Sequence, residues 1–345
     1  MNRSLAGILG IFALITSTIA CQINTTTVKE VTGVAPSSEP SRIATRFPTI
    51  TVIESSPTQL PPSPTPTVAE NPKRTAPIDG MVQVLVPEGE FIMGSNAWDT
   101  VLHAPVWLDS YWIDQTEVTN AMFAQFVSST HYLTDAEKRG TGYAYQTSSS
   151  DTVKISGASW RHPHGPGSNI NGMEQHPVVQ ISWNDASAYC KWAGRRLPTE
   201  AEWEKAARGT DGRLYPWGDQ APAGNLANLA DKQLDTVYEV DDGFKFTAPV
   251  GSYPDGSSPY GALDMIGNAA EWVQDWYNGV YPQSSQNETL RNPQGASSGE
   301  NRVMRGGCWN TSNDSDGEYR LASHRNKNMP KLSADTSGFR CASSK

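Results

Sequence analysis

Two carboxylates lie on either side of a glycine turn in the pattern Asp264-x-x-Gly267-x-Ala269-x-Glu271. Calcium binds six to eight hard oxygen atoms, and backbone carbonyls serve as well as carboxylates, so this pattern can supply a calcium site. The same residues fit a capped turn that leads into a short helix over Glu271–Trp276 equally well. The residue types alone leave both interpretations open.

Two imidazoles, those of His162 and His164, lie on one side of an extended segment and could bind a metal ion. Pro163 and Gly165 beside them favour a loop that packs on Trp160 instead. The sequence contains no nucleophile elbow, phosphate-binding loop or HExxH helix, so the motifs of common hydrolases, nucleotide-binding enzymes and metalloproteases are missing.

The first 21 residues have the features of an export signal. Arg3 precedes a largely apolar run over Leu5–Ala20, which is short for a membrane span of about 20 residues. Thr18-Ile19-Ala20-Cys21 looks like the cleavage box of a bacterial lipoprotein, with Cys21 as the lipidated residue. A plain signal peptide with an incidental cysteine is the alternative. We expect residues 1–21 to be a lipoprotein signal. The protein is therefore expected to be exported and to face outward or into the periplasm.

Residues 22–77 form a linker rich in Ser, Thr and Pro, as in Pro61-Pro62-Ser63-Pro64. Such a segment cannot bury enough apolar surface to offset the entropy of ordering, so it is expected to be disordered. As a random coil its ends would be roughly 40 Å apart, which is enough to hold a domain away from a membrane surface.

The charge of the chain restricts its partners. The formal net charge is −9, and removal of Arg3 with the signal leaves −10. Without a basic stripe, an acidic chain is not expected to bind nucleic acid or anionic lipid. The expected contact with a membrane is therefore the lipid on Cys21.

Residues 78–345 are expected to form one domain, because no second low-complexity segment interrupts them. Three helices follow from apolar spacing and capping residues, and short apolar runs predict five strands. The helices follow Thr119, Trp183-Asn184 and Thr199, and the strands cover Met81–Pro87, Glu90–Met93, Val106–Ile113, Val303–Arg305 and Gly338–Cys341.

The run from His176 to Gly209 resembles the formylglycine-generating enzyme, or sulfatase-modifying factor, family. The resemblance covers nearly everything after the linker. It implies an α+β fold of the C-type-lectin-like kind with little regular secondary structure. Five shorter landmarks of the family occur in the family's order: Phe91–Gly94, Glu117–Asn120, Tyr215–Gly218, Asp264–Asn268 and Gly338–Cys341.

The resemblance also implies two structural calcium ions. An Asn is common in the family where this chain has Asp264, and a carboxylate there adds negative charge without weakening the site. For the site that contains Asn228 and Asp242, the alternative is an ordinary solvated acidic loop. The implied ligands are Asp264, Gly267, Ala269 and Glu271 at one site, and Asn228, Leu229, Asp242 and Phe244 at the other.

Cys190 and Cys341 match a pair of cysteines that is bridged in the family. Export would place the chain where disulfides form. Two buried thiols that behave as small apolar residues are the alternative.

The oxidising members of the family convert a sulfatase cysteine to formylglycine with oxygen, and they hold copper(I) between two thiolates. Copper(I) is a soft ion, and paired thiolates select it. The matching positions, three and eight residues beyond Cys308, hold Thr311 and Asp316. Their hard oxygens do not suit copper(I), so copper is not expected as a cofactor.

Cys308 stands where most of the family has Ser, and it has no expected partner among the four cysteines. Together with a nitrogen of His324 it could form a different metal site. The only support for such a site is that the two residues are close in sequence. The structural alternative is that Cys308 fills a small pocket.

Two functions remain open. In the first, the domain is a calcium-stabilised binding or scaffold module of the cell envelope, with a groove at Arg305, Trp309 and Arg325 for a peptide or carbohydrate. Arg325 can pair with a carboxylate. In the second, it is a formylglycine-generating type of oxidoreductase, or another enzyme, that uses an atypical site around Cys308. A shared fold does not decide between them.

Overall fold

A computed structural model describes residues 71–345 apart from 96–103, 235–240, 280, 282–287 and 313–319. The expected signal peptide, Cys21 and most of the expected linker lie outside these residues. No helix in the described part of the chain is long and apolar enough to cross a membrane.

The first sheet joins the two ends of the described chain. Its strand order is β1 (Lys73–Thr75), β2 (Val82–Val86), β5 (Tyr111–Asp114) and β13 (Ala342–Ser344), and each neighbouring pair is antiparallel. Strand β1 falls inside the expected linker 22–77. The folded region therefore begins before the expected boundary, because the backbone of Lys73–Thr75 pairs with β2.

The second sheet contains β11 (Asn326–Asn328), β10 (Arg302–Arg305), β8 (Ala270–Trp276) and β12 (Ser337–Gly338), in that order. The helix suggested over Glu271–Trp276 is wrong, since these residues form β8. This strand pairs with a neighbour on each side, and five of its first six residues are buried. Burial on both faces removes the alternating pattern that identifies a strand.

Two smaller sheets complete the strands. The predicted strand Val106–Ile113 is divided at Asp109, and its halves belong to different sheets. The predicted strand Gly338–Cys341 is also wrong, because most of it connects β12 to β13. One small sheet contains β3 (Gly89–Met93), β4 (Ala104–Leu108) and β9 (Leu290–Arg291), and the other contains β6 (Thr141–Gln146) and β7 (Asp151–Ser156).

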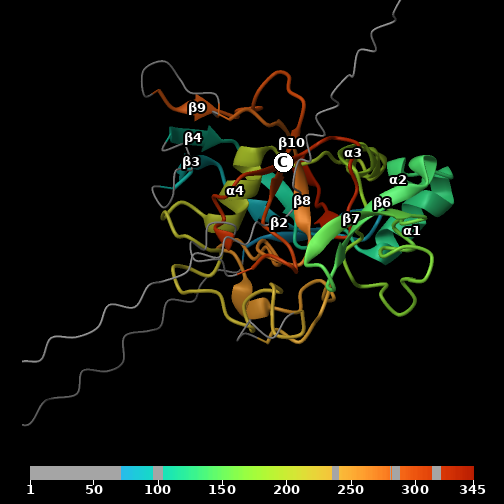
Figure 1. The fold of residues 1–345 in the computed structure, drawn as a ribbon. Coiled ribbons are helices and arrows are strands. Elements are labelled where there is room, and N and C mark those ends of the chain that lie inside the picture. The colour runs from blue at the N-terminus through green and yellow to red at the C-terminus, as the bar shows by residue number, and fades with distance from the viewer. Residues whose placement is uncertain (1–70, 96–103, 235–240, 280, 282–287, 313–319) are drawn as a thin grey trace, which may run out of the picture. The chain divides into compact units, whose positions relative to one another are not determined.

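The three predicted helices are confirmed as α1 (Asn120–Thr130), α3 (Trp183–Trp192) and α4 (Glu200–Arg208). At α4, Thr199 and Glu202 form the predicted capping box, in which each side chain accepts from the other residue's backbone N–H. A five-residue helix α2 (Asp135–Arg139) and a 3₁₀ turn at Pro254–Gly256 were not predicted. Figure 1 shows α4 near β3 and β8, and long irregular segments between the elements, as the predicted α+β fold requires.

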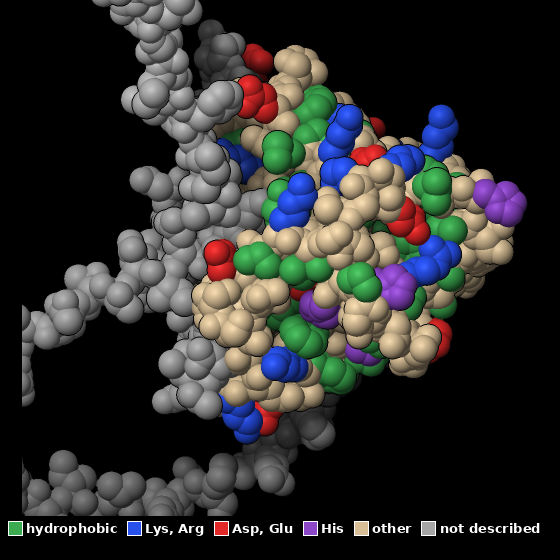
Figure 2. Space-filling model, turned by 45° about the vertical axis from the view of Figure 1, so that its right-hand side comes forward, with side chains coloured by type: hydrophobic (Ala, Val, Ile, Leu, Met, Phe, Trp, Pro, Cys, Tyr) green, Lys and Arg blue, Asp and Glu red, His purple; other side chains and the backbone are tan. Residues whose placement is uncertain are grey.

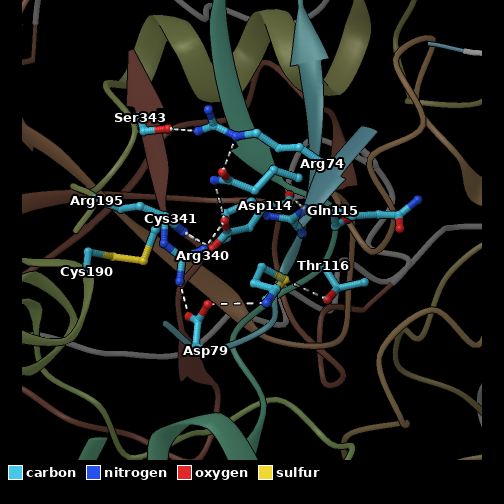
Figure 3. Close-up of polar contacts among 12 residues, drawn as sticks. Arg74, Asp79, Asp114, Gln115, Thr116, Cys190, Arg195, Arg340, Cys341 and Ser343 are labelled. Atoms are coloured by element: carbon cyan, nitrogen blue, oxygen red, sulfur yellow. Dashed lines mark hydrogen bonds and ion pairs between the residues drawn. A yellow bond between two sulfur atoms is a disulfide. The ribbon is translucent and has the colours of Figure 1, made fainter. Parts of the chain in front are cut away.

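The predicted disulfide is confirmed. Cys190 of α3 is bonded to Cys341, with the two Cα atoms 5.6 Å apart. Figure 3 shows this bond beside Arg195, whose guanidinium pairs with the carboxylates of Asp79 and Asp114. The backbone N–H of Cys341 donates to Asp114 Oδ2 at 2.8 Å, so the disulfide and the buried ion network hold the same strand end.

A buried carboxyl group connects β8 to the start of α4. Asp275 is 1% exposed, and its Oδ2 accepts the N–H of Glu200 at 2.8 Å. Burial, together with the nearby carboxylate of Glu200, raises the pKa of Asp275 to about 8. The folded protein therefore holds this carboxyl group protonated at neutral pH.

We predict that Asp275→Asn flattens the dependence of stability on pH. Because the pKa in the folded state exceeds the ordinary value of 3.8, folding takes up a proton between roughly pH 4 and pH 8. The stabilisation is thus present below about pH 4 and lost as the pH rises to about 8. Urea unfolding should show a smaller loss of stability from pH 5 to 8 in the variant than in the wild type. Equal losses would contradict this account.

Candidate functional site

Thr311 occupies the first position at which the resemblance places a copper-binding cysteine. It is 1% exposed, and its Oγ1 accepts the N–H of Cys308 at 2.9 Å. The Cys308 Sγ donates to Asn310 Oδ1 at 2.9 Å and lies 3.6 Å from Thr311 Oγ1. The hydroxyl therefore closes a local turn beside a buried thiol. The second position, Asp316, lies outside the described residues.

The surroundings of Cys308 favour a packing role for its side chain. It belongs to the same buried hydrophobic cluster as Trp272 and Met304. The imidazole of His324 is half-buried, and desolvation and the charge of Arg305 lower its pKa to about 4. The imidazole is therefore neutral at neutral pH, as a core histidine would be.

The three residues expected to line a groove are committed to internal contacts. Arg305 is fully buried and pairs with Glu200 at 2.8 Å and with Glu204 at 2.6 Å. Arg325 makes a two-pronged contact with the same Glu200, at 2.6 and 3.0 Å. Both guanidiniums are therefore held by carboxylates inside the protein.

Trp309, the third of these residues, is 1% exposed, and its indole N–H donates to the Asp335 carbonyl at 3.1 Å. The half-exposed rings of Tyr145 and Phe246 pack edge-on against it, with ring centroids 5.7 and 5.0 Å away. The indole is thus a buried support for two more accessible rings. On the face shown in Figure 2, hydrophobic side chains are scattered among polar ones.

The structure brings the residues of one expected calcium site together. The carboxylate of Asp242 accepts the N–H of Leu229 at 2.8 Å and that of Phe244 at 3.0 Å. Burial is the main cause that raises the pKa of Asp242 to about 7, and the neighbouring Asp231 adds to it. The Oδ1 of Asn228 is buried and has no hydrogen-bond partner among the described residues. A hard cation fits this set, because it would satisfy the amide oxygen and neutralise the carboxylate.

The other expected calcium site, at Asp264, is only partly assembled as predicted. Asp264 is in the left-handed region, with φ of 54°, and its Oδ2 accepts the N–H of Gly251 at 2.6 Å. Its Oδ1 is buried and, within the described part of the chain, has no partner other than the carboxyl group of Glu117. Burial raises the pKa of Asp264 to about 6. In contrast, both oxygens of Glu271 already accept hydrogen bonds from Arg340.

A carboxylate that the sequence analysis did not assign, that of Glu117, lies beside Asp264. Its Oε1 accepts the N–H of Ala269 at 3.2 Å, and its Oε2 is buried. The carboxyl groups of Glu117 and Asp264 are within hydrogen-bonding reach of each other. Glu117 is part of the landmark Glu117–Asn120, but no local pattern connects it to a site about 150 residues further along.

The two expected calcium sites share a close backbone contact. The N–H of Asn268 donates to the Asn228 carbonyl at 2.8 Å. A Cβ atom on Gly267 would lie 2.1 Å from the same carbonyl oxygen, and φ at Gly267 is +83°, so the position needs glycine. Among the described residues no three His, Cys, Asp or Glu side chains form a metal-binding group. A cation at either site would therefore need amide or backbone oxygens in addition to carboxylates.

Comparisons with known proteins agree with these landmarks. The family model of the sulfatase-modifying factor enzyme 1-like domain matches residues 66–345. The formylglycine-generating enzyme of Bos taurus is 41% identical over 284 residues, which cover 75% of this chain and 74% of that protein. The inactive C-alpha-formylglycine-generating enzyme 2 of Mus musculus is 36% identical over 281 residues, which cover 76% of this chain and 85% of that protein.

A solved structure also resembles this chain. PvdO from Pseudomonas aeruginosa has a TM-score of 0.59 at 25% identity, over 80% of this chain and 99% of that one. The neighbours share the C-type-lectin-like fold that the resemblance implied. The chain therefore belongs to the formylglycine-generating enzyme, or sulfatase-modifying factor, family.

Proposed function

We propose that this protein does not carry out copper(I)-dependent cysteine oxidation and acts as a calcium-stabilised binding or scaffold module of the cell envelope. The observation that carries this proposal is the buried Thr311, whose hydroxyl is used to close the turn at Cys308. A hydroxyl is a hard donor, so the first expected thiolate position has no soft ligand. The similarity to a relative named as inactive supports the same reading.

A ligand of this module would contact side chains other than the internally paired Arg305 and Arg325. The half-exposed rings of Tyr145 and Phe246, which rest on Trp309, offer apolar faces beside the half-exposed His164. Rings of this kind can pack against a sugar face or an apolar peptide side chain. These contacts support a peptide or carbohydrate partner.

We predict that the purified domain does not bind copper(I) tightly and does not consume oxygen with a cysteine-containing peptide. The measurement is an anaerobic copper(I) titration followed by an oxygen-electrode assay. A formylglycine-generating enzyme with both cysteines serves as the positive control. Tight copper binding with peptide-dependent oxygen uptake, both lost in Cys308→Ser, would replace the binding module by the alternative of an oxidoreductase with an atypical site.

Calcium at the two expected sites is part of the proposal. Within the described residues, the buried Oδ1 of Asn228 has no hydrogen-bond partner, and that of Asp264 has none other than the Glu117 carboxyl group. In each set at least one buried carboxylate has a raised pKa, which means that burial disfavours its charged form. A divalent cation would restore the balance of charge and hold long loops in place.

We predict that chelation of calcium lowers the melting temperature. A ligand present at 100 times its Kd stabilises the folded state by about 2.7 kcal/mol, which corresponds to roughly 5–10 °C for a domain of this size. Scanning calorimetry with EDTA, and with EDTA already saturated with calcium, separates ion removal from other effects of the chelator. The same melting temperature in both conditions would contradict the proposal that calcium stabilises the domain.

Export and lipid anchoring through Cys21 complete the proposal, supported by the cleavage-box pattern and the long Ser/Thr/Pro-rich linker. We predict that the expressed wild type partitions into the detergent phase of a Triton X-114 extraction and carries a diacylglyceryl group on Cys21. Cys21→Ser should move the protein to the aqueous phase. A wild type that is cleaved elsewhere and carries no lipid by mass spectrometry would show a plain signal peptide.

A further inference from the structure

Asp335 connects three residues of the surface beside Trp309. Its side chain is 1% exposed, and its Oδ2 lies 3.2 Å from Nδ1 of His164 and accepts the backbone N–H of Tyr145 at 2.9 Å. Its backbone carbonyl accepts the indole N–H of Trp309 at 3.1 Å. One buried residue therefore positions an imidazole, a strand that carries a half-exposed tyrosine, and the tryptophan that supports this tyrosine.

The imidazole of His164 keeps one nitrogen for a ligand. An ionised carboxylate only accepts hydrogen bonds, so Asp335 holds the proton of the neutral imidazole on Nδ1 and leaves the lone pair on Nε2. No donor or acceptor in the described part of the chain contacts this Nε2, and the His164 side chain is 32% exposed. The free nitrogen can therefore accept a hydrogen bond from a molecule in solution.

The loop that carries His164 is fixed from below by a buried glutamine. The side-chain amide of Gln180 donates to the carbonyl of Pro163 at 2.6 Å and to that of Tyr143 at 2.7 Å. The backbone of Gln180 is in the left-handed region, with φ of 61°, which is uncommon for a residue other than glycine. The N–H of His164 itself donates to Ser168 Oγ at 2.9 Å. The imidazole is thus held in place before any ligand arrives, which lowers the entropy lost on binding.

The backbone edge of β6 at this surface is already occupied. The N–H of Tyr143 donates to the Ser333 carbonyl, and the N–H of Asp335 donates to the Tyr143 carbonyl, each at 3.0 Å. The next N–H on this edge, that of Tyr145, is taken by the Asp335 carboxylate. A peptide that adds as a strand needs an open row of backbone groups. Recognition at this surface therefore depends on side chains.

These side chains combine hydrogen-bonding groups with apolar rings. The ring centroids of His164 and Phe246 are 4.5 Å apart, and the rings of Phe246 and Tyr145 pack on Trp309. The exposed ammonium of Lys245 lies 5.6 Å from the centre of the Phe246 ring and adds a donor. A sugar suits this combination, because its hydroxyls both donate and accept and its C–H faces pack on aromatic rings.

We propose that this surface binds a β-linked saccharide of glucose or N-acetylglucosamine units, with one hydroxyl donating to Nε2 of His164 and a sugar face packed against the neighbouring rings. Such units carry their ring substituents in equatorial positions, so both faces of each ring are apolar. Asp335 is the positioning residue that keeps Nε2 open. This inference rests on the proposed binding module and narrows its partner from a peptide or carbohydrate to a carbohydrate.

The test is a calorimetric titration of the full-length protein, in Triton X-100 with calcium present, with cellotetraose and with N,N′,N″-triacetylchitotriose. At least one of these probes should bind, and His164→Ala should weaken that binding at least about tenfold through the lost hydrogen bond. Tyr145→Ala should weaken it as well. His131→Asn is the matched control, because it removes an exposed imidazole at a left-handed position that Asn tolerates, and it should bind as the wild type does.

The role of Asp335 has a spectroscopic readout. Nitrogen-15 NMR of the His164 ring should show the proton on Nδ1 in the wild type. Asp335→Asn keeps an acceptor oxygen and should retain this tautomer and most of the affinity, whereas Asp335→Ala should lose both. A wild-type imidazole protonated on Nε2 would overturn the positioning role, whether or not the Ala variant folds.

The remaining outcomes separate this inference from the proposed function. If neither saccharide binds, or if His164→Ala binds as tightly as the wild type, the inference is overturned, while a binding module with a peptide partner stands. Copper-dependent oxygen uptake with a cysteine-containing peptide would instead remove the binding module and this inference together.

Discussion

The ion pair between Arg340 and Glu271 is the contact on which the rest of this domain depends. It joins β8 to the segment between β12 and β13, and Arg340 also binds carbonyls at the end of β5 and at the turn before Gly267. A buried guanidinium is tolerated only when its donors are satisfied, so these segments must take up one arrangement together. The neighbouring disulfide of Cys341 adds a covalent link to α3 at the same place.

The local parts of the fold could be predicted from the sequence, and the parts built by distant residues could not. The capping box at Thr199 and the apolar face after Thr119 lie within one or two helical turns, so periodicity and caps identify α1 and α4. Strand β8 lacks the alternating pattern of a half-exposed strand, because it is buried on both faces. The strand expected over Val106–Ile113 is two strands, and the polar pair Asp109-Ser110 is the local signal of the break between them.

The same division applies to the candidate site. The resemblance identifies the turn at Asp264 and the group around Asp242, and the structure brings Asp242 into hydrogen-bonding contact with Leu229 and Phe244. It could not reveal Glu117, which reaches the turn through the fold. Nor could it show that Arg305 and Arg325 share Glu200 inside the protein. Partners about 100 residues apart leave no spacing signal in a single sequence.

The family architecture is kept, while the first expected copper position, Thr311, and the expected calcium positions all hold oxygen donors. The two observations agree, because oxygen atoms suit calcium and do not suit copper(I). Elemental analysis by mass spectrometry of protein purified without added metal tests this most directly. The account predicts calcium at one or two ions per chain and only traces of copper. Copper in equimolar amount, retained through dialysis, would contradict it.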